Sequence, residues 1–150
     1  MCLVNGPQSW RTLPRRALMR SGLGRRLLWR ARSASEVEFW AGWLAGTTGN
    51  EEWTRDRNSR LDPDTQITDP LVRAELDGNN AQEISVLDVG AGPITSLGYR
   101  YPGKTLTIVA TDPLADYYDR LLGDAALDPP IRTIRVPGEE LLEYFGARRF

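Results

Sequence analysis

The clearest hydrophobic pattern lies in the second half of the chain, where short apolar runs alternate with helical periodicity. Residues 84–89, 106–111 and 131–136 are short runs rich in β-branched residues, which predict strands buried on both faces. Helical spacing is found over 115–122 and 139–145. Because strands and helices alternate, we expect an α/β fold built from β-α-β units, with a parallel sheet of about three strands.

A wider apolar stripe precedes the strands. Ser35 and Glu38 fit a capping box, and the apolar spacing that follows predicts a helix with a stop at Gly46. Three of the five tryptophans lie in or just after this helix: Trp40, Trp43 and Trp53. They fit either an aromatic lid over a pocket or, as we prefer, a helix that packs its apolar face on the domain.

A polar, turn-rich segment, residues 46–66, follows that helix. A second helix is predicted to start near Thr68 or Asp69, with Pro70 in its first position, and to end before Gly78. The three predicted parts of the chain are therefore a leader (1–33), a helical extension (34–80) and an α/β region (81–150).

The net charge of −1 conceals two different halves. Residues 1–35 contain eight arginines and no acid, which leaves the rest of the chain with a net charge of −9. An arginine-rich, acid-poor leader fits a nucleic-acid or anionic-membrane patch, or a transit peptide. It contains no known nucleic-acid motif, so we prefer a poorly ordered extension, with a possible helix over 15–32.

The composition excludes several kinds of chemistry. With no histidine, the chain has no histidine base, histidine metal ligand or Ser/His/Asp triad. A single cysteine, Cys2, excludes an internal disulfide framework and a multi-cysteine zinc site, and we expect no metal. No apolar run is long enough to cross a membrane, and we expect a cytoplasmic protein.

A glycine turn and an acid carry the candidate chemistry. Gly90 and Gly92 follow the first predicted strand, where the missing β-carbon lets a ligand approach the backbone closely. Asp112 ends the next strand, 22 residues after Gly90, and a carboxylate there can accept both hydroxyls of a ribose. Both features belong to the carboxyl ends of parallel strands, so we predict a site for a cofactor that contains a nucleoside.

Two details separate the candidate nucleosides. A dinucleotide fingerprint wants a third glycine where this chain has Thr95. Asp88 would face a pyrophosphate unfavourably but suits a ligand with an ammonium group. The segment 86–93, Val-Leu-Asp-Val-Gly-Ala-Gly-Pro, resembles motif I of the class I S-adenosylmethionine-dependent methyltransferases. The likeness covers about residues 84–146, and the tryptophan-rich helix is similar to the N-terminal extension of some uncharacterised members.

The resemblance implies a Rossmann-like fold and a role for each matching residue. Gly90, Ala91 and Gly92 would pass under the methionine part of S-adenosyl-L-methionine, and Asp88 would hold its amino group. Asp112 would bind the ribose hydroxyls. The adenine would lie against Pro113 or Leu114, with Glu139, or alternatively Glu140, at its amino group.

The resemblance also predicts an incomplete domain. The family has seven strands, and this chain ends where the fourth should begin, so we expect a cofactor-binding half with weak or absent activity alone. The first strand would then be an uncovered edge that could self-associate. The methyl acceptor and the catalytic base cannot be assigned. The alternatives are a nicotinamide-dependent Rossmann oxidoreductase, and a non-catalytic remnant or interaction module.

Overall fold

The structure, a computed structural model, describes residues 22–147 and residue 150. Contacts divide the chain into two units, Met1–Ser35 and Glu36–Phe150. The described part of the first unit is the beginning of helix α2 (Gly22–Leu44). Most of the predicted basic leader, including residues 15–21 of its possible helix, therefore lies outside the described residues.

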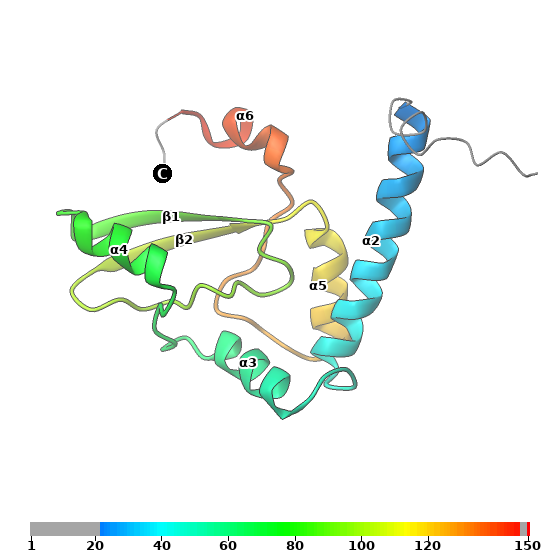
Figure 1. Cartoon of the computed structure of the whole chain (residues 1–150), viewed down its shortest axis with the longest axis horizontal. Helices are drawn as coiled ribbons and strands as arrows, with labels where there is room; N and C mark the ends of the chain where they lie inside the picture. The colour runs from blue at the N-terminus through cyan, green and yellow to red at the C-terminus, as the bar shows by residue number, and fades with distance from the viewer. Residues whose placement is uncertain (1–21, 148–149) are drawn as a thin grey trace, which may run out of the picture. The chain divides into compact units, whose positions relative to one another are not determined.

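The second unit combines helices with a parallel sheet (Figure 1). After the end of α2, its elements are α3 (Glu51–Leu61), α4 (Pro70–Gly78), β1 (Glu83–Val89), β2 (Thr105–Thr111), α5 (Ala115–Asp124), the 3-10 helix η1 (Gly138–Glu140) and α6 (Leu141–Phe145). Strands β1 and β2 pair in parallel, with Glu83 opposite Thr105 and Val89 opposite Thr111. The α/β class and both of these strands are thus confirmed.

Local sequence signals account for several boundaries. The Asp69 carboxylate accepts hydrogen bonds from the backbone N–H groups of Leu71 and Val72, at 2.9 and 3.0 Å, and caps α4. Pro70 occupies the first turn, where no N–H is needed. Helix α2 ends as predicted, because Gly46 adopts a φ of 69° and its N–H bonds back to the Trp43 carbonyl.

Two helical predictions were wrong. Ser35 does not cap a helix, because α2 runs through it from Gly22 to Leu44. The preceding residues are rich in arginine, leucine and alanine, which are strong helix formers, so the helix starts earlier. The turn-rich segment 46–66 contains α3, whose first turn is capped by the Asn50 side chain.

The third strand is also a correction. Residues 131–136 form no regular strand and only one parallel bridge, between Ile134 and Thr111. The Val136 N–H turns back to the Ile134 carbonyl at 3.0 Å, and this local bond ends the pairing. The helix expected over 139–145 is split into η1 and the short α6.

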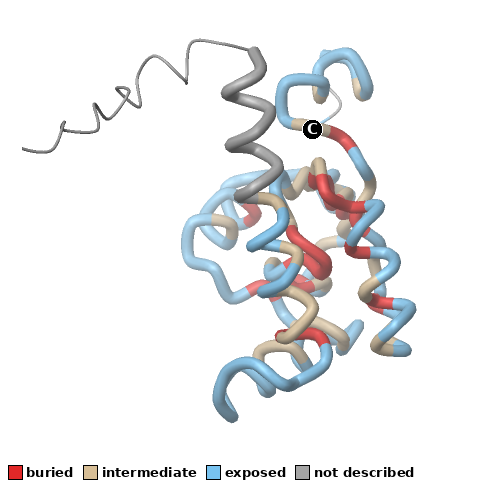
Figure 2. Tube along the Cα trace, turned by 90° about the vertical axis from the view of Figure 1, so that its right-hand side faces the viewer, coloured by how far each residue is buried: buried red, intermediate tan, exposed pale blue. Residues whose placement is uncertain are grey.

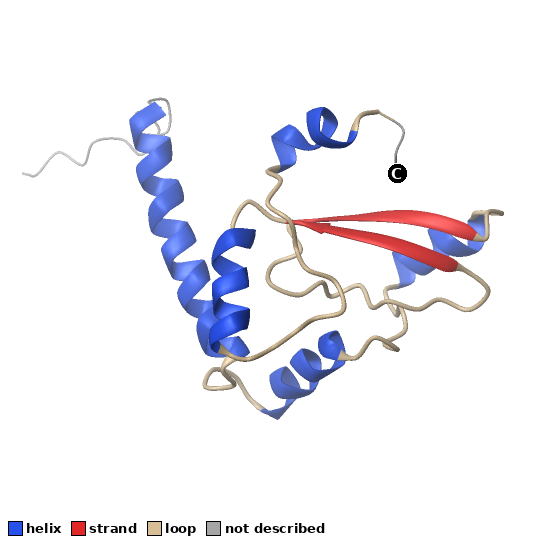
Figure 3. Ribbon diagram, turned by 180° about the vertical axis from the view of Figure 1, so that it is seen from behind, coloured by secondary structure: helices blue, strands red, loops and turns tan. Residues whose placement is uncertain are grey.

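The connection between β1 and β2 contains no helix, so the expected β-α-β unit is not formed here (Figure 3). Residues 90–104 instead form a loop of turns, in which Gly98 and Gly103 have positive φ. The loop bridges residues 65–67: the Tyr99 N–H bonds to the Thr65 carbonyl at 2.7 Å. These backbone bonds replace the partners that a helix would have supplied.

Two apolar clusters hold the unit together. Figure 2 marks the buried positions of the chain in red. One joins the end of α2 to the connecting loop and α5, through Trp43, Leu44, Ile94 and Leu122. The other packs α4 on the sheet and contains Ile67, Leu76 and Tyr101, flanked by Val72, Ile84 and Leu106. The first cluster fixes the loop that carries the candidate site.

Candidate functional site

Three segments meet at the carboxyl ends of the strands. A β-carbon on Gly138 would lie 4.0 Å from the Val89 side chain, so the start of η1 adjoins the end of β1. The buried Thr133 hydroxyl donates to the Gly92 carbonyl at 2.7 Å. The structure thus brings the predicted glycine turn, the end of β2 and the segment before Glu139 to one edge of the sheet.

The two glycines of the turn, Gly90–Gly92, face different surroundings. Both have positive φ, 75° for Gly90 and 68° for Gly92, a conformation that strongly favours glycine. A β-carbon at Gly90 would meet no atom within 4 Å, whereas one at Gly92 would lie 3.1 Å from the Trp40 ring. A ligand could therefore approach the turn at Gly90, while Trp40 closes it at Gly92.

The backbone N–H groups of the glycine turn all point into the protein. Gly90 and Ala91 donate to the Thr111 carbonyl, at 2.8 and 3.1 Å, and Gly92 donates to Oδ2 of Asp112 at 3.3 Å. None of these three donors is free to cradle a phosphate. The turn offers a ligand a close surface rather than a ring of donors.

Asp112 is buried directly behind this turn. Its side chain is 5% exposed and accepts a second backbone hydrogen bond, from Leu114 at 2.8 Å. Burial raises the pKa of Asp112, the two backbone bonds oppose that rise, and the charges of Glu36 and Asp88 add to it. A carboxylate has about four acceptor positions, so two remain beyond the backbone bonds.

Asp88 lies at the end of β1 and is half-buried. The Thr95 hydroxyl donates to Oδ2 of Asp88 at 2.6 Å and accepts from the Leu97 N–H at 3.2 Å. In the sequence, Thr95 was notable only because a dinucleotide fingerprint has a glycine at that position. In the structure, its hydroxyl orients the Asp88 carboxylate. Its side chain is fully buried, and the Ser/Thr tendency to bond nearby backbone was the available signal.

The residues expected around an adenine differ in accessibility. Pro113 is half-buried, while Leu114 is 3% exposed and packs in the interior at the start of α5. Glu139 and Glu140 are both exposed in η1. Pro113 and the two glutamates therefore have surface to offer a ligand, and Leu114 offers almost none.

The end of α2 adds three contacts that the sequence did not reveal. Trp40 lies against Gly92, and its ring centroid is 6.5 Å from that of Tyr118. The Tyr118 hydroxyl donates to Oε1 of Glu36 at 3.0 Å. Burial, then the charge of Asp112 and the bond to Glu36, raise the pKa of Tyr118. Partners 82 residues apart leave no local sequence signal.

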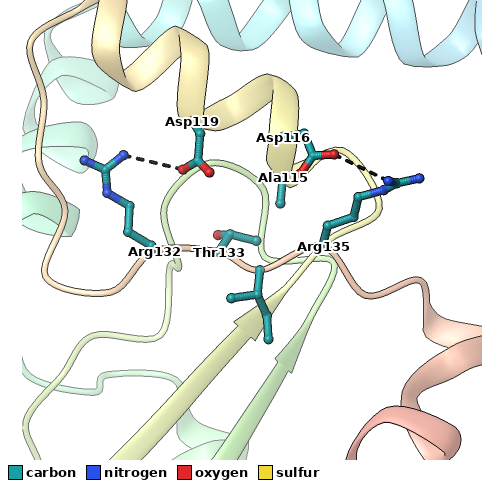
Figure 4. Close-up of a pocket in the computed structure, with 7 residues that line it drawn as sticks. Ala115, Asp116, Asp119, Arg132, Thr133 and Arg135 are labelled. Carbon is teal, nitrogen blue, oxygen red and sulfur yellow. Dashed lines mark hydrogen bonds and ion pairs between the residues drawn. The ribbon is translucent and has the colours of Figure 1, made fainter.

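A pocket of about 470 Å³ lies between α5 and residues 132–135 (Figure 4). Two ion pairs line it, Arg132–Asp119 at 3.5 Å and Arg135–Asp116 at 3.4 Å. Both pairs are exposed and contribute at most about 1 kcal/mol each. None of the predicted site residues lines this pocket.

No family model, curated protein or solved structure matches the chain. The described residues contain no cluster of three or more potential His, Cys, Asp or Glu metal ligands. Among the described helices, none has the length and apolar character needed to span a membrane. The described part of the chain is of the α/β class, with a two-stranded parallel sheet and helices.

Proposed function

We propose that residues 36–150 form a Rossmann-like unit that binds S-adenosyl-L-methionine, the cofactor-binding part of a class I methyltransferase. The observation that carries the proposal is the hydrogen bond between the Gly92 N–H and Asp112 Oδ2, at 3.3 Å. It joins the glycine turn after β1 to the acid after β2, the two features a nucleoside ligand would need together. We further propose that the protein is cytoplasmic.

Each residue would have a defined task. The methionine part of the cofactor would cross the open side of Gly90 and Ala91, and Asp88, oriented by Thr95, would accept from its ammonium group. Asp112 would accept the ribose hydroxyls with its remaining acceptor positions. Pro113 would lie against the adenine, and Glu139 or Glu140 would accept from the adenine amino group.

The bound cofactor would supply an electrophilic methyl group on a sulfonium. This chain's residues would hold the cofactor so that the methyl carbon faces an incoming nucleophile in line. Such positioning is the main source of acceleration in reactions of this type. Deprotonation of the acceptor, where it is needed, is not assigned to any residue.

The dinucleotide alternative fits the geometry less well. A pyrophosphate is normally held by free backbone N–H groups and a helix N-terminus after the glycine turn. Here the three N–H groups are already bonded within the protein, so the turn has no free backbone donor for a pyrophosphate. The carboxylates of Asp88 and Asp112 would also repel the phosphates.

Calorimetric titration of the full chain tests the proposal. Separate titrations use S-adenosylhomocysteine, S-adenosylmethionine and NAD. Binding of the adenosyl ligands supports the proposal, and binding of NAD alone would replace it with an oxidoreductase. Binding of none would favour a non-catalytic module.

Variants then test the assignment of the acid. Asp112→Ala should weaken adenosyl-ligand binding at least tenfold, because the ribose loses a charged acceptor. Asp124→Ala, an exposed acid at the end of α5, is the matched control and should bind as the wild type does. An unchanged affinity in folded Asp112→Ala would remove Asp112 from the site.

A further inference from the structure

The last turns of α2 form a wall beside the glycine turn. Trp40 is half-buried, and Cζ2 of its indole lies 3.1 Å from the position that a β-carbon on Gly92 would take. A flat aromatic ring in this place excludes water from one side of the turn. Charges next to such a ring are screened less than they would be in open solvent.

Tyr118 ties this wall to α5. Its ring is 1% exposed, stands nearly perpendicular to Trp40 at 78°, and its hydroxyl holds the Glu36 carboxylate at 3.0 Å. Glu36 and Trp40 are four residues apart and therefore lie on the same face of α2. The bond holds this exposed carboxylate on the face that carries Trp40.

The charged side chains of Asp88, Asp112 and Glu36 around the glycine turn are all carboxylates. Asp88 lies at the end of β1, Asp112 lies behind the turn, and the charge of Glu36 acts on Asp112 together with that of Asp88. A positively charged ligand gains from each of these carboxylates, and an anionic ligand loses.

Resting on the proposed function, we propose that Glu36, held by Tyr118 and placed beside Trp40, is a specificity-determining residue that selects the cationic sulfonium form of the cofactor. The carboxylate acts on the ligand through its charge, from the face of α2 that also carries Trp40. It is not expected to bond the ribose or the adenine, which belong to other residues of the site.

A pair of ligands isolates this effect. S-adenosylmethionine carries a positive sulfonium, and S-adenosylhomocysteine has a neutral thioether at the same atom. Glu36→Gln keeps the size of the side chain and an oxygen for Tyr118 but removes the charge. We expect its affinity for S-adenosylmethionine to fall roughly threefold, as for one partly screened charge, with little change for S-adenosylhomocysteine.

Two further variants separate charge from structure. Glu38→Gln removes an exposed acid two positions along α2, on the opposite face, and should leave both affinities unchanged. Tyr118→Phe frees Glu36 and should lower the same affinity ratio by a smaller factor. Circular dichroism confirms that each variant is folded before its titration.

The outcomes are distinct. A selective loss of S-adenosylmethionine affinity in Glu36→Gln, with Glu38→Gln unchanged, supports the inference. If the wild type binds both ligands and Glu36→Gln alters them equally or not at all, the inference fails while the proposed function stands. If the wild type binds neither ligand, both fail together.

Discussion

The carboxyl ends of β1 and β2 lie side by side and yet differ in how far each is exposed. Val89 and Thr111 are register partners, but Val89 is 53% exposed and Thr111 is fully buried. β1 continues into Gly90, which faces open space, and β2 continues into Asp112, which is 5% exposed. One strand end presents surface, and its neighbour supports that surface from behind.

The difference has a simple origin in the described part of the sheet. β2 is bonded on one side to β1 and on the other to Ile134, through the Ala110 carbonyl and the Asp112 N–H. β1 has β2 as its partner within the described residues. The less covered strand end therefore offers the wider contact surface, and the more covered end offers a single buried carboxylate, Asp112.

The largest effect is expected at the buried end. Asp112→Ala leaves two buried backbone N–H groups without an acceptor, those of Gly92 and Leu114. Each unsatisfied donor costs about 1–3 kcal/mol. We expect the free energy of unfolding to fall by about 3 kcal/mol, measured by urea denaturation. A loss below about 1 kcal/mol would show that Asp112 does not support the turn.

The same carboxyl has a pH signature. Its pKa is raised in the folded state above 3.8, mainly by burial. Its contribution to stability is therefore complete below pH 3.8 and is lost as the pH rises through the folded-state pKa. Asp112→Asn does not titrate, so the stability of the wild type relative to this variant should decrease over that interval. A pH-independent difference would contradict the raised pKa.

The two glycines give the next contrast. Gly92→Ala must tolerate both a positive φ and the Trp40 ring, and we expect a loss of about 2 kcal/mol or more. Gly90→Ala meets only the backbone strain, about 1 kcal/mol, because nothing lies near its β-carbon. Thermal unfolding of both variants measures the difference. Equal losses would mean that Trp40 does not close the turn.

The smallest effects concern the register partners themselves. Thr111→Val removes the hydroxyl that donates to the Asp88 carbonyl at 3.2 Å, which should cost about 1 kcal/mol. Val89→Thr changes an exposed side chain and should stay within about 0.5 kcal/mol of the wild type. Urea denaturation of the pair reports both values, and a reversed order would refute the contrast between the two strand ends.

The sequence predicts those elements whose signals are local. Continuous β-branched runs mark β1 and β2, and Asp69 followed by Pro70 marks α4. Helix α3 has no buried residue, so it shows no apolar stripe. It is fixed instead by Arg57, which donates to the carbonyls that end α2, and by Arg60, which donates to the Ile94 carbonyl 34 residues away.

The candidate site divides in the same way. The carboxyl ends of parallel strands lie at the same edge of a sheet, which predicts Gly90 and Asp112 there. The structure has both residues at that edge. The partners Thr95 and Trp40 could not be predicted, because their positions depend on a loop without a helix and on the course of α2. Such contacts follow from tertiary packing and not from any spacing in the sequence.

The inward-facing N–H groups of the glycine turn separate two properties that usually vary together. Gly90 is open to solvent, but its amide proton is bonded to the Thr111 carbonyl at 2.8 Å, as is that of Ala91 at 3.1 Å. Amide hydrogen exchange at both positions should therefore be slow, even at the exposed Gly90, and its rate should follow the opening of the β2 end rather than the access of water. The exchange rate of these turn amides thus reports how often the hydrogen bonds to the end of β2 open, although the turn itself lies at the surface.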